Sequence, residues 1–234
     1  MPELPEVETT KRGIERLLKN KTVESTIVHQ YKFRQPIARN IGNILKSQTL
    51  RTVSRRAKYL LFNFTKGTLI IHLGMSGSLR VVSPNTPKAK HDHVEISFND
   101  NLCLRFRDPR RFGLVIWTKQ DPLKHKLLKN CGPEPLTQQF SAIYLKRVAE
   151  NRTCAIKQFI MLNNVVVGVG NIYASEALFS AGINPNRPAN SIDLHEFGRL
   201  SKSIKTVLRR AIRAGGTTLQ DLKNEHGDAG YFQQ

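Results

Sequence analysis

The feature of this sequence that most constrains its fold is a series of short β-rich segments between about residues 22 and 118, with no helical pattern between them. Segments such as KYLLFNF, TLIIHLG and HVEISF have the length of strands, and turn signals such as Lys66-Gly67 separate them. Successive strands without intervening helices usually pair antiparallel. This part of the chain is therefore predicted to form an antiparallel sandwich or barrel.

Helical periodicity flanks this β region on both sides. Before it, apolar residues recur at helical spacing from about residue 6 to 19, and Pro5 suits the first turn of a helix. After it, the loop KNCGPEPLTQQF leads into four further helical patterns, at residues 138–150, 154–162, 171–182 and 193–213. The sequence thus predicts an α+β protein with two domains, residues 1–130 and residues 131–234.

The charge of the chain is strongly unbalanced. It has 37 Lys and Arg against 18 Asp and Glu, which gives a formal net charge of +19. Such an excess attracts polyanions, and it favours nucleic acid over an anionic membrane or an acidic protein. The basic residues of 193–213 share one helix face, which either contacts a polyanion or is an ordinary solvated face. They are Arg199, Lys202, Lys205, Arg209, Arg210 and Arg213.

The apolar runs and the cysteines indicate the cellular compartment in which the protein is expected. The longest apolar runs have strand length, well short of the ~20 residues that a membrane-spanning helix needs. The acidic start MPELPEVETT has no secretory signal. The three cysteines form no C-x-x-C pair, so reduced thiols are expected rather than disulfides or a zinc site. We expect a cytoplasmic, monomeric protein with no membrane contact, metal or other cofactor.

The N-terminus offers a nucleophile. Pro2 is small enough to allow removal of Met1, which would leave a secondary amine with a pKa of about 8. Such an amine can attack a sugar C1′ and form an iminium, with a neighbouring carboxyl group, Glu3, moving protons. The alternative is that PELPEVE is only the acidic, proline-containing start of a helix.

Two further segments carry groups that suit nucleic acid. Gly168-Val169-Gly170-Asn171 precedes a helix, so its backbone N–H groups could hold a phosphate, or the turn could simply cap the helix. The loop RFRDPRRFG places Arg110 and Arg111 beside Phe112, which suits phosphate binding or insertion into a duplex. Alternatively, Phe112 is buried and the arginines pair with local carboxylates. Met75, taken alone, is expected to be a core or turn residue.

Taken together, these segments resemble one known family. PELPEVETT, RRAKYLL, HLGMSGSLR, KHDHV, DPRRFG, GPEPL, AIK, VVGVGNIYASEALF, GGTTL and GYFQQ occur in the order and approximate spacing of formamidopyrimidine-DNA glycosylase. The resemblance covers essentially the whole chain. It implies a bacterial, nucleoid-associated repair enzyme with an N-terminal β-sandwich and a helix–two-turn–helix domain. It further implies excision of 8-oxoguanine and formamidopyrimidines from duplex DNA, action at abasic sites, and strand cleavage by β,δ-elimination.

The resemblance also implies roles for individual residues. Pro2 would be the Schiff-base nucleophile, Glu3 the general acid/base, and Glu6 a support for the terminus. Phosphate near the extruded nucleotide would be held by Lys58, His91, Arg111 and Asn171. The space left in the duplex would be filled by Met75, Arg110 and Phe112, with Arg110 contacting the orphaned cytosine. The site around the flipped base would include Lys157, Glu176, Gly216, Thr217 and Thr218.

One departure from the family pattern matters. The family continues past GYFQQ into a hairpin whose four cysteines bind zinc, whereas this sequence ends at Gln234 without such a motif. We therefore expect no zinc, and either a truncated protein or one that works without the finger. Two alternatives to the oxidised-purine enzyme stay open: an oxidised-pyrimidine glycosylase of the endonuclease VIII type, and a catalytically impaired protein that binds damaged DNA.

Overall fold

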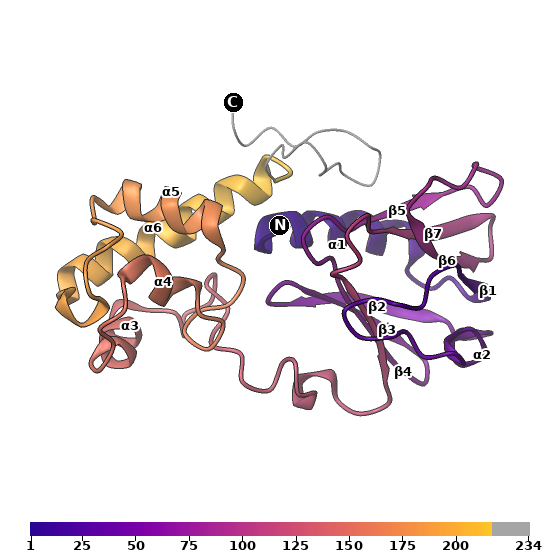
Figure 1. Ribbon diagram of the computed structural model, residues 1–234, viewed down its shortest axis with the longest axis horizontal. Coiled ribbons are helices and arrows are strands. Elements are labelled where there is room, and N and C mark those ends of the chain that lie inside the picture. The colour runs from indigo at the N-terminus through magenta and orange to yellow at the C-terminus, as the bar shows by residue number, and fades with distance from the viewer. Residues whose placement is uncertain (217–234) are drawn as a thin grey trace.

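A computed structural model describes residues 1–216 of the chain, and it contains two four-stranded antiparallel sheets followed by a set of helices (Figure 1). The first sheet has the order β1 (Val23–Val28), β6 (Asp92–Phe98), β7 (Leu102–Arg107) and β5 (Ser78–Val82). The second has the order β2 (Leu50–Arg56), β3 (Tyr59–Phe64), β4 (Gly67–His72) and β8 (Leu114–Thr118). The predicted α+β class and the antiparallel sandwich are confirmed.

The two sheets share one apolar core. Strand β6 shows why, since its side chains alternate between buried and half-buried positions, with Val94, Ile96 and Phe98 inward. Residues of β2, β3 and β4 and the helix α1 (Leu4–Leu18) complete the same cluster. Each buried aliphatic or aromatic side chain stabilises the fold by about 1.5–3 kcal/mol.

Helix α1 joins the two halves of the molecule. Val7, Ile14 and Leu18 pack into the core of the sandwich, whereas Leu4 packs into the core of the helical half. The helix starts at Leu4, two residues before the predicted start, because a proline is tolerated in a first turn. In Figure 1 this helix lies between the sheets and the later helices. The predicted boundary at residue 130 stays a prediction, but contacts of α1 cross it.

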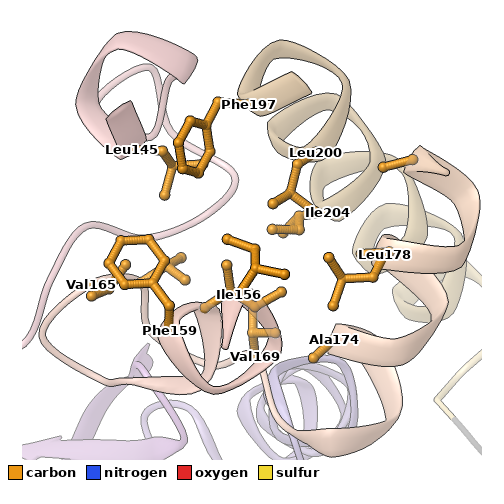
Figure 2. Packing of buried hydrophobic residues seen from close by; sticks show 14 of the residues in the cluster. Leu145, Ile156, Phe159, Val165, Val169, Ala174, Leu178, Phe197, Leu200 and Ile204 are labelled. Carbon is orange, nitrogen blue, oxygen red and sulfur yellow. The ribbon is translucent and has the colours of Figure 1, made fainter. Parts of the chain in front are cut away.

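Up to residue 216, the helical half contains four α-helices, all close to the predicted ranges. They are α3 (Ala142–Ala149), α4 (Ile156–Met161), α5 (Asn171–Ala181) and α6 (Leu194–Arg213). Helix α3 starts four residues later than predicted because the Ser141 hydroxyl accepts a hydrogen bond from Tyr144 N at 3.2 Å and so caps it there. Figure 2 shows side chains of all four helices converging on one core.

Some elements were not predicted. The short helix α2 (Ile41–Leu45) and two 3-10 turns, Pro122–Lys124 and Ala189–Ser191, have too few residues to show a periodic pattern. Among residues 1–216, no helix combines the length and the apolar character needed to cross a membrane.

The connection between the halves is fixed by one carboxylate. Glu134 lies in the segment that leads from the sandwich to α3, and it forms ion pairs with Arg55 at 2.8 Å and with Arg56 at 3.0 Å. It also accepts a hydrogen bond from Ala57 N at 2.8 Å. The turn between β2 and β3 is therefore attached to the linker, and this turn carries Lys58.

Candidate active site

The residues that follow Met1 are buried between the two halves of the molecule. Pro2 is buried and the Glu3 side chain is only 2% exposed, while Met1 is 42% exposed. The Glu3 carboxylate accepts hydrogen bonds from Gly170 N at 2.7 Å and from Ile172 N at 2.9 Å. These N–H groups belong to the start of α5, where the helix dipole favours a negative charge. Glu3 therefore caps a helix 167 residues away in the sequence.

The glycines before α5 are required by this close approach. A Cβ atom on Gly170 would lie 2.4 Å from Glu3 Cδ, and one on Gly168 would lie 2.7 Å from Leu4 Cβ. Leu4 N also donates a hydrogen bond to Gly168 O at 3.0 Å. The N–H groups of Gly170 and Ile172 bind Glu3 and are therefore not available to a phosphate, and phosphate binding by the other groups of this turn stays a prediction. The Asn171 side chain is exposed and free to face another molecule.

Lys58 provides a positive charge near Glu3. It follows Ala57, whose φ of +55° turns the chain between β2 and β3, and it is only 8% exposed. Burial raises the pKa of the Glu3 carboxyl, against the opposing effects of Lys58 and of the N–H donors of α5. Burial likewise lowers the pKa of the Lys58 ammonium, against the attraction of Glu3 and Glu6. Both shifts make proton exchange at these groups easier near neutral pH.

Glu6 connects the N-terminus to α5 and to the end of α6. Its carboxylate accepts a hydrogen bond from Glu3 N at 2.8 Å and another from the Tyr173 hydroxyl at 2.5 Å. A Cβ atom on Gly216 would lie 3.1 Å from Glu6 Oε1, so Gly216 lies directly against this carboxylate. Tyr173 was not among the predicted site residues, because a tyrosine in an apolar helix suggests only packing. Thr217 and Thr218 lie outside the described residues.

The three residues predicted to enter the duplex lie on adjacent loops. Met75 is 43% exposed and Phe112 is 44% exposed, and the Arg110 guanidinium lies 4.8 Å from the centre of the Phe112 ring. The alternatives of a core methionine and a buried phenylalanine are therefore wrong. Exposed apolar side chains next to a stacked guanidinium suit contact with bases.

A buried aspartate joins these two loops. Asp108 is 0% exposed, and its carboxylate accepts hydrogen bonds from the Ser76 hydroxyl at 2.9 Å and from Gly113 N at 2.8 Å. Asp108 was not among the predicted site residues. Its acceptor role depends on Ser76, 32 residues earlier, and no local pattern reveals such a contact.

The other predicted phosphate ligands lie around the same loops. His91 O accepts a hydrogen bond from Asp108 N at 3.1 Å, which places His91 beside the Arg110 loop. Arg111 is exposed, with φ of +57°, and its carbonyl accepts a hydrogen bond from Arg34 N at 3.1 Å. The positions of these residues are compatible with phosphate binding, which stays a prediction.

Lys157 and Glu176 lie apart from these groups. Lys157, on α4, lines a cavity of about 440 Å³ whose other walls come from α5 and residues 182–185. None of the residues that surround Glu3 lines this cavity. Glu176 is exposed on α5. Their predicted place beside a flipped base stays a prediction.

No metal centre is formed by residues 1–216, where no group of three His, Cys, Asp or Glu side chains could hold an ion. The three cysteines are free thiols, with Cys103 buried and Cys131 and Cys154 half-buried. The described residues therefore do not fit a zinc site.

Comparison with known proteins gives matches over nearly the whole chain. Residues 1–115 match the family model for the formamidopyrimidine-DNA glycosylase N-terminal domain, and residues 131–223 match its H2TH domain. Formamidopyrimidine-DNA glycosylase of Pseudomonas aeruginosa is 53% identical over 234 residues, which are 100% of this chain and 86% of the relative.

Solved structures agree with these sequence matches. The MutM (Fpg) protein of Thermus thermophilus has a TM-score of 0.88 at 34% identity, covering 99% of this chain and 85% of that chain. A Lactococcus lactis Fpg mutant, solved with DNA that contains Fapy-dG, has a TM-score of 0.90 at 31% identity, covering 99% and 86%.

Proposed function

Because the chain belongs to the formamidopyrimidine-DNA glycosylase family, whose members repair oxidised purines by base excision, we propose that it removes 8-oxoguanine and formamidopyrimidines from duplex DNA. We propose further that it cleaves the strand at the resulting abasic site by β,δ-elimination, through a Schiff base on Pro2. The proposed place of action is the bacterial nucleoid. The Fapy-dG DNA held by the Lactococcus lactis relative supports this substrate class.

One observation carries the proposal. The buried Glu3 carboxylate is adjacent in the chain to Pro2, is held at the start of α5, and faces the charge of Lys58. This arrangement, where the two halves of the molecule join, supports Pro2 as the nucleophile, Glu3 as the proton-transfer group and Lys58 as a nearby cation. An ordinary acidic helix start would instead expose its carboxylate to water.

In the proposed reaction, the Pro2 nitrogen attacks C1′ of the damaged nucleotide, and the glycosidic bond breaks as the base leaves with its electron pair and takes up a proton. Glu3 donates a proton to O4′ as the sugar ring opens and the iminium forms. Loss of a C2′ proton then expels the 3′ phosphate, and a second elimination expels the 5′ phosphate. Water releases the sugar fragment and regenerates the amine.

Other residues have proposed roles in binding. Lys58 and Arg111 neutralise phosphates around the extruded nucleotide, so affinity for DNA depends steeply on salt. His91 and Asn171 donate hydrogen bonds to these phosphates. Met75, Arg110 and Phe112 fill the space left in the stack. No step is assigned to a metal ion, because the described residues do not fit one.

Borohydride trapping tests this proposal. The chain is purified, loss of Met1 is established by intact mass, and the protein is incubated with borohydride and duplexes containing 8-oxoguanine or thymine glycol. A covalent adduct with the 8-oxoguanine duplex is expected. Pro2→Gly is expected to reduce the adduct strongly, and Pro36→Gly, an exposed proline elsewhere, should leave it unchanged.

The other outcomes identify the alternatives. Preferential trapping on thymine glycol would indicate an oxidised-pyrimidine enzyme. Tight binding of damaged duplex without any adduct would indicate a catalytically impaired DNA-binding protein. Equal trapping by Pro2→Gly and by the unaltered chain would refute Pro2 as the nucleophile.

A further inference from the structure

The outer face of α6 carries a row of cations that the site around Glu3 does not use. Lys202, Arg209 and Arg213 are exposed, and their spacing along the helix keeps them within about 40° of one another around its axis. These three residues are called the α6 stripe. At the rise of an α-helix, the stripe is roughly 17 Å long.

The opposite face of α6 is fixed in the core of the helical half. Leu200, Ile204 and Leu208 are buried there with residues of α3, α4 and α5. Figure 2 shows Leu200 and Ile204 pointing into this core. Helix α6 also contacts α1. The α6 stripe therefore points away from α1 and α5, the two helices that hold Glu3 and its hydrogen-bond donors.

Contacts within the molecule do not account for the α6 stripe. Other basic side chains of this helix are engaged, since Arg199 donates to Ala181 O at 3.2 Å and Lys205 donates to Thr137 O at 3.1 Å. In the part of the chain that the structure describes, the side chains of the stripe form no hydrogen bond and no ion pair. The helix dipole favours Arg213 in the last turn, but it acts little on the other two members.

The charge of the α6 stripe is not balanced along its own helix. The one acidic side chain of α6 is Glu196 in the first turn, and it pairs with Arg187. Arg209 and Arg213 lie four residues apart, an arrangement of like charges that weakens a helix. The stripe therefore costs the helix some stability, and a bound polyanion would remove this repulsion.

The dimensions of the α6 stripe suit a DNA duplex. A duplex carries about one negative charge per 1.7 Å of its axis, so roughly ten phosphates lie within the length of the stripe. A small anion requires cations that converge on one point, whereas Lys202 and Arg213 leave the helix three turns apart. Contacts of this kind bind the phosphate backbone without regard to sequence.

We propose that the α6 stripe binds the phosphate backbone of a second DNA segment while the site around Glu3 holds the first. The inference rests on the proposed function, because it takes a duplex to be bound at that site. A protein that holds two segments at once transfers directly from one to the other, without first dissociating into solvent. The stripe thus supports the search for damage rather than the excision step.

A triple variant removes the α6 stripe. It combines Lys202→Gln, Arg209→Gln and Arg213→Gln, all at exposed positions where glutamine is a good helix former. The variant is therefore expected to fold as the unaltered chain does, and single-turnover excision of 8-oxoguanine from a short duplex checks this. That rate should stay within about twofold of the unaltered chain, because the lesion site keeps all its phosphate contacts.

A control variant removes the same charge elsewhere. It combines Lys46→Gln, Arg51→Gln and Lys66→Gln, three exposed cations near the start of β2 and the β3–β4 turn. This end of the two strands is opposite the turn that carries Lys58. The control therefore has the net charge of the stripe variant but keeps the α6 stripe.

Direct transfer is measured as the release of a labelled duplex while an unlabelled duplex is added at increasing concentration. Release from the unaltered chain should become faster in proportion to the competitor, because the competitor binds before the first duplex leaves. The stripe variant should weaken this dependence by about tenfold, and the control should stay within about twofold. The salt dependence of the second binding should become shallower by about one logarithmic unit per lost charge.

Three results would overturn the inference. They are release from the unaltered chain that does not depend on the competitor, equal behaviour of the stripe and control variants, and a loss of excision in the stripe variant as large as its loss of transfer. The last result would make the α6 stripe a part of the lesion site. An unaltered chain that transfers between duplexes but excises nothing would refute the proposed function alone, so the two failures are distinguishable.

Discussion

The carboxylate of Glu3 accepts a hydrogen bond from the backbone N–H of Gly170 at 2.7 Å, and this contact joins the first residues of the chain to the first turn of α5. The contact fixes the carboxylate and, through it, the adjacent Pro2. It also occupies a backbone N–H group that could otherwise donate a hydrogen bond to a bound anion. Any substitution that moves Glu3 or Gly170 should therefore reduce the rate of excision more than it reduces the affinity for DNA.

Gly170→Ala should separate the effect on catalysis from the effect on DNA binding. The added Cβ would lie 2.4 Å from Glu3 Cδ, so either the carboxylate or the start of α5 must shift. We expect roughly a 100-fold loss in single-turnover excision, as is typical when a catalytic group is misplaced by about 1 Å. Unfolding in urea should show a loss of about 1–3 kcal/mol from the overlap.

Gly198→Ala is the matched control, because nothing lies within 4 Å of the added Cβ in α6. It should leave excision unchanged and stabilise the protein by about 0.5–1 kcal/mol through helix propensity. An unimpaired Gly170→Ala enzyme would show that the Glu3 contact is dispensable.

Glu134→Gln tests the link between the halves of the molecule. The substitution keeps the size of the side chain but removes the charge that pairs with Arg55 and Arg56, whose side chains are 11% and 20% exposed. We expect the free energy of unfolding to fall by about 1–3 kcal/mol. Glu150→Gln, at an exposed position after α3, should change it by no more than about 0.5 kcal/mol. Equal effects would argue against a structural role for the Glu134 ion pairs.

The pKa of His72 predicts a specific dependence of stability on pH. Since burial and the charges of Lys58 and Arg34 lower this pKa from 6.5 to about 4, the unfolded imidazole takes up a proton first as the pH falls. The contribution of His72 to the free energy of unfolding is therefore complete above about pH 6.5. It is lost progressively as the pH falls towards 4, and the total loss is roughly 3 kcal/mol.

Urea unfolding between pH 7 and pH 4 measures this contribution as the difference between the unaltered chain and His72→Asn, which does not titrate. His93, whose pKa is also lowered by burial, is present in both proteins and cancels. Parallel stability curves for the two proteins would contradict a lowered pKa at His72.

Arg105→Met should release the segment between β5 and β6. Arg105 is only 3% exposed, and its guanidinium donates hydrogen bonds to Thr86 O at 2.6 Å and to Pro87 O at 3.1 Å. Without them, local opening should raise tryptic cleavage after Lys88 and Lys90 by about tenfold relative to other sites. Arg107→Met, at an exposed position on the same strand, should leave the cleavage pattern unchanged. Unchanged cleavage in Arg105→Met would show that other contacts hold this segment.

Local patterns were sufficient for most of the fold. The strands of the sandwich and the four later helices follow from alternation, helical periodicity and turn residues, each of which acts over a few neighbouring positions. The errors lie at helix ends, as at α1 and α3, and in elements too short for a period, such as α2. The candidate catalytic residues Pro2 and Glu3 could be named from the sequence because they occupy its first positions.

The sequence by itself determined the order of the elements, the excess of positive charge and the chemical types available at the N-terminus. Only the tertiary structure decided that the N–H groups before α5 bind Glu3, that Asp108 joins two loops, and that His72 closes the turn before Met75. The Glu3 and Asp108 contacts connect residues 167 and 32 positions apart, and the His72 bond acts only where β4 lies beside the Lys58 turn. Periodicity describes the near neighbours of a residue, whereas hydrogen bonds and desolvation depend on what the folded chain brings against it.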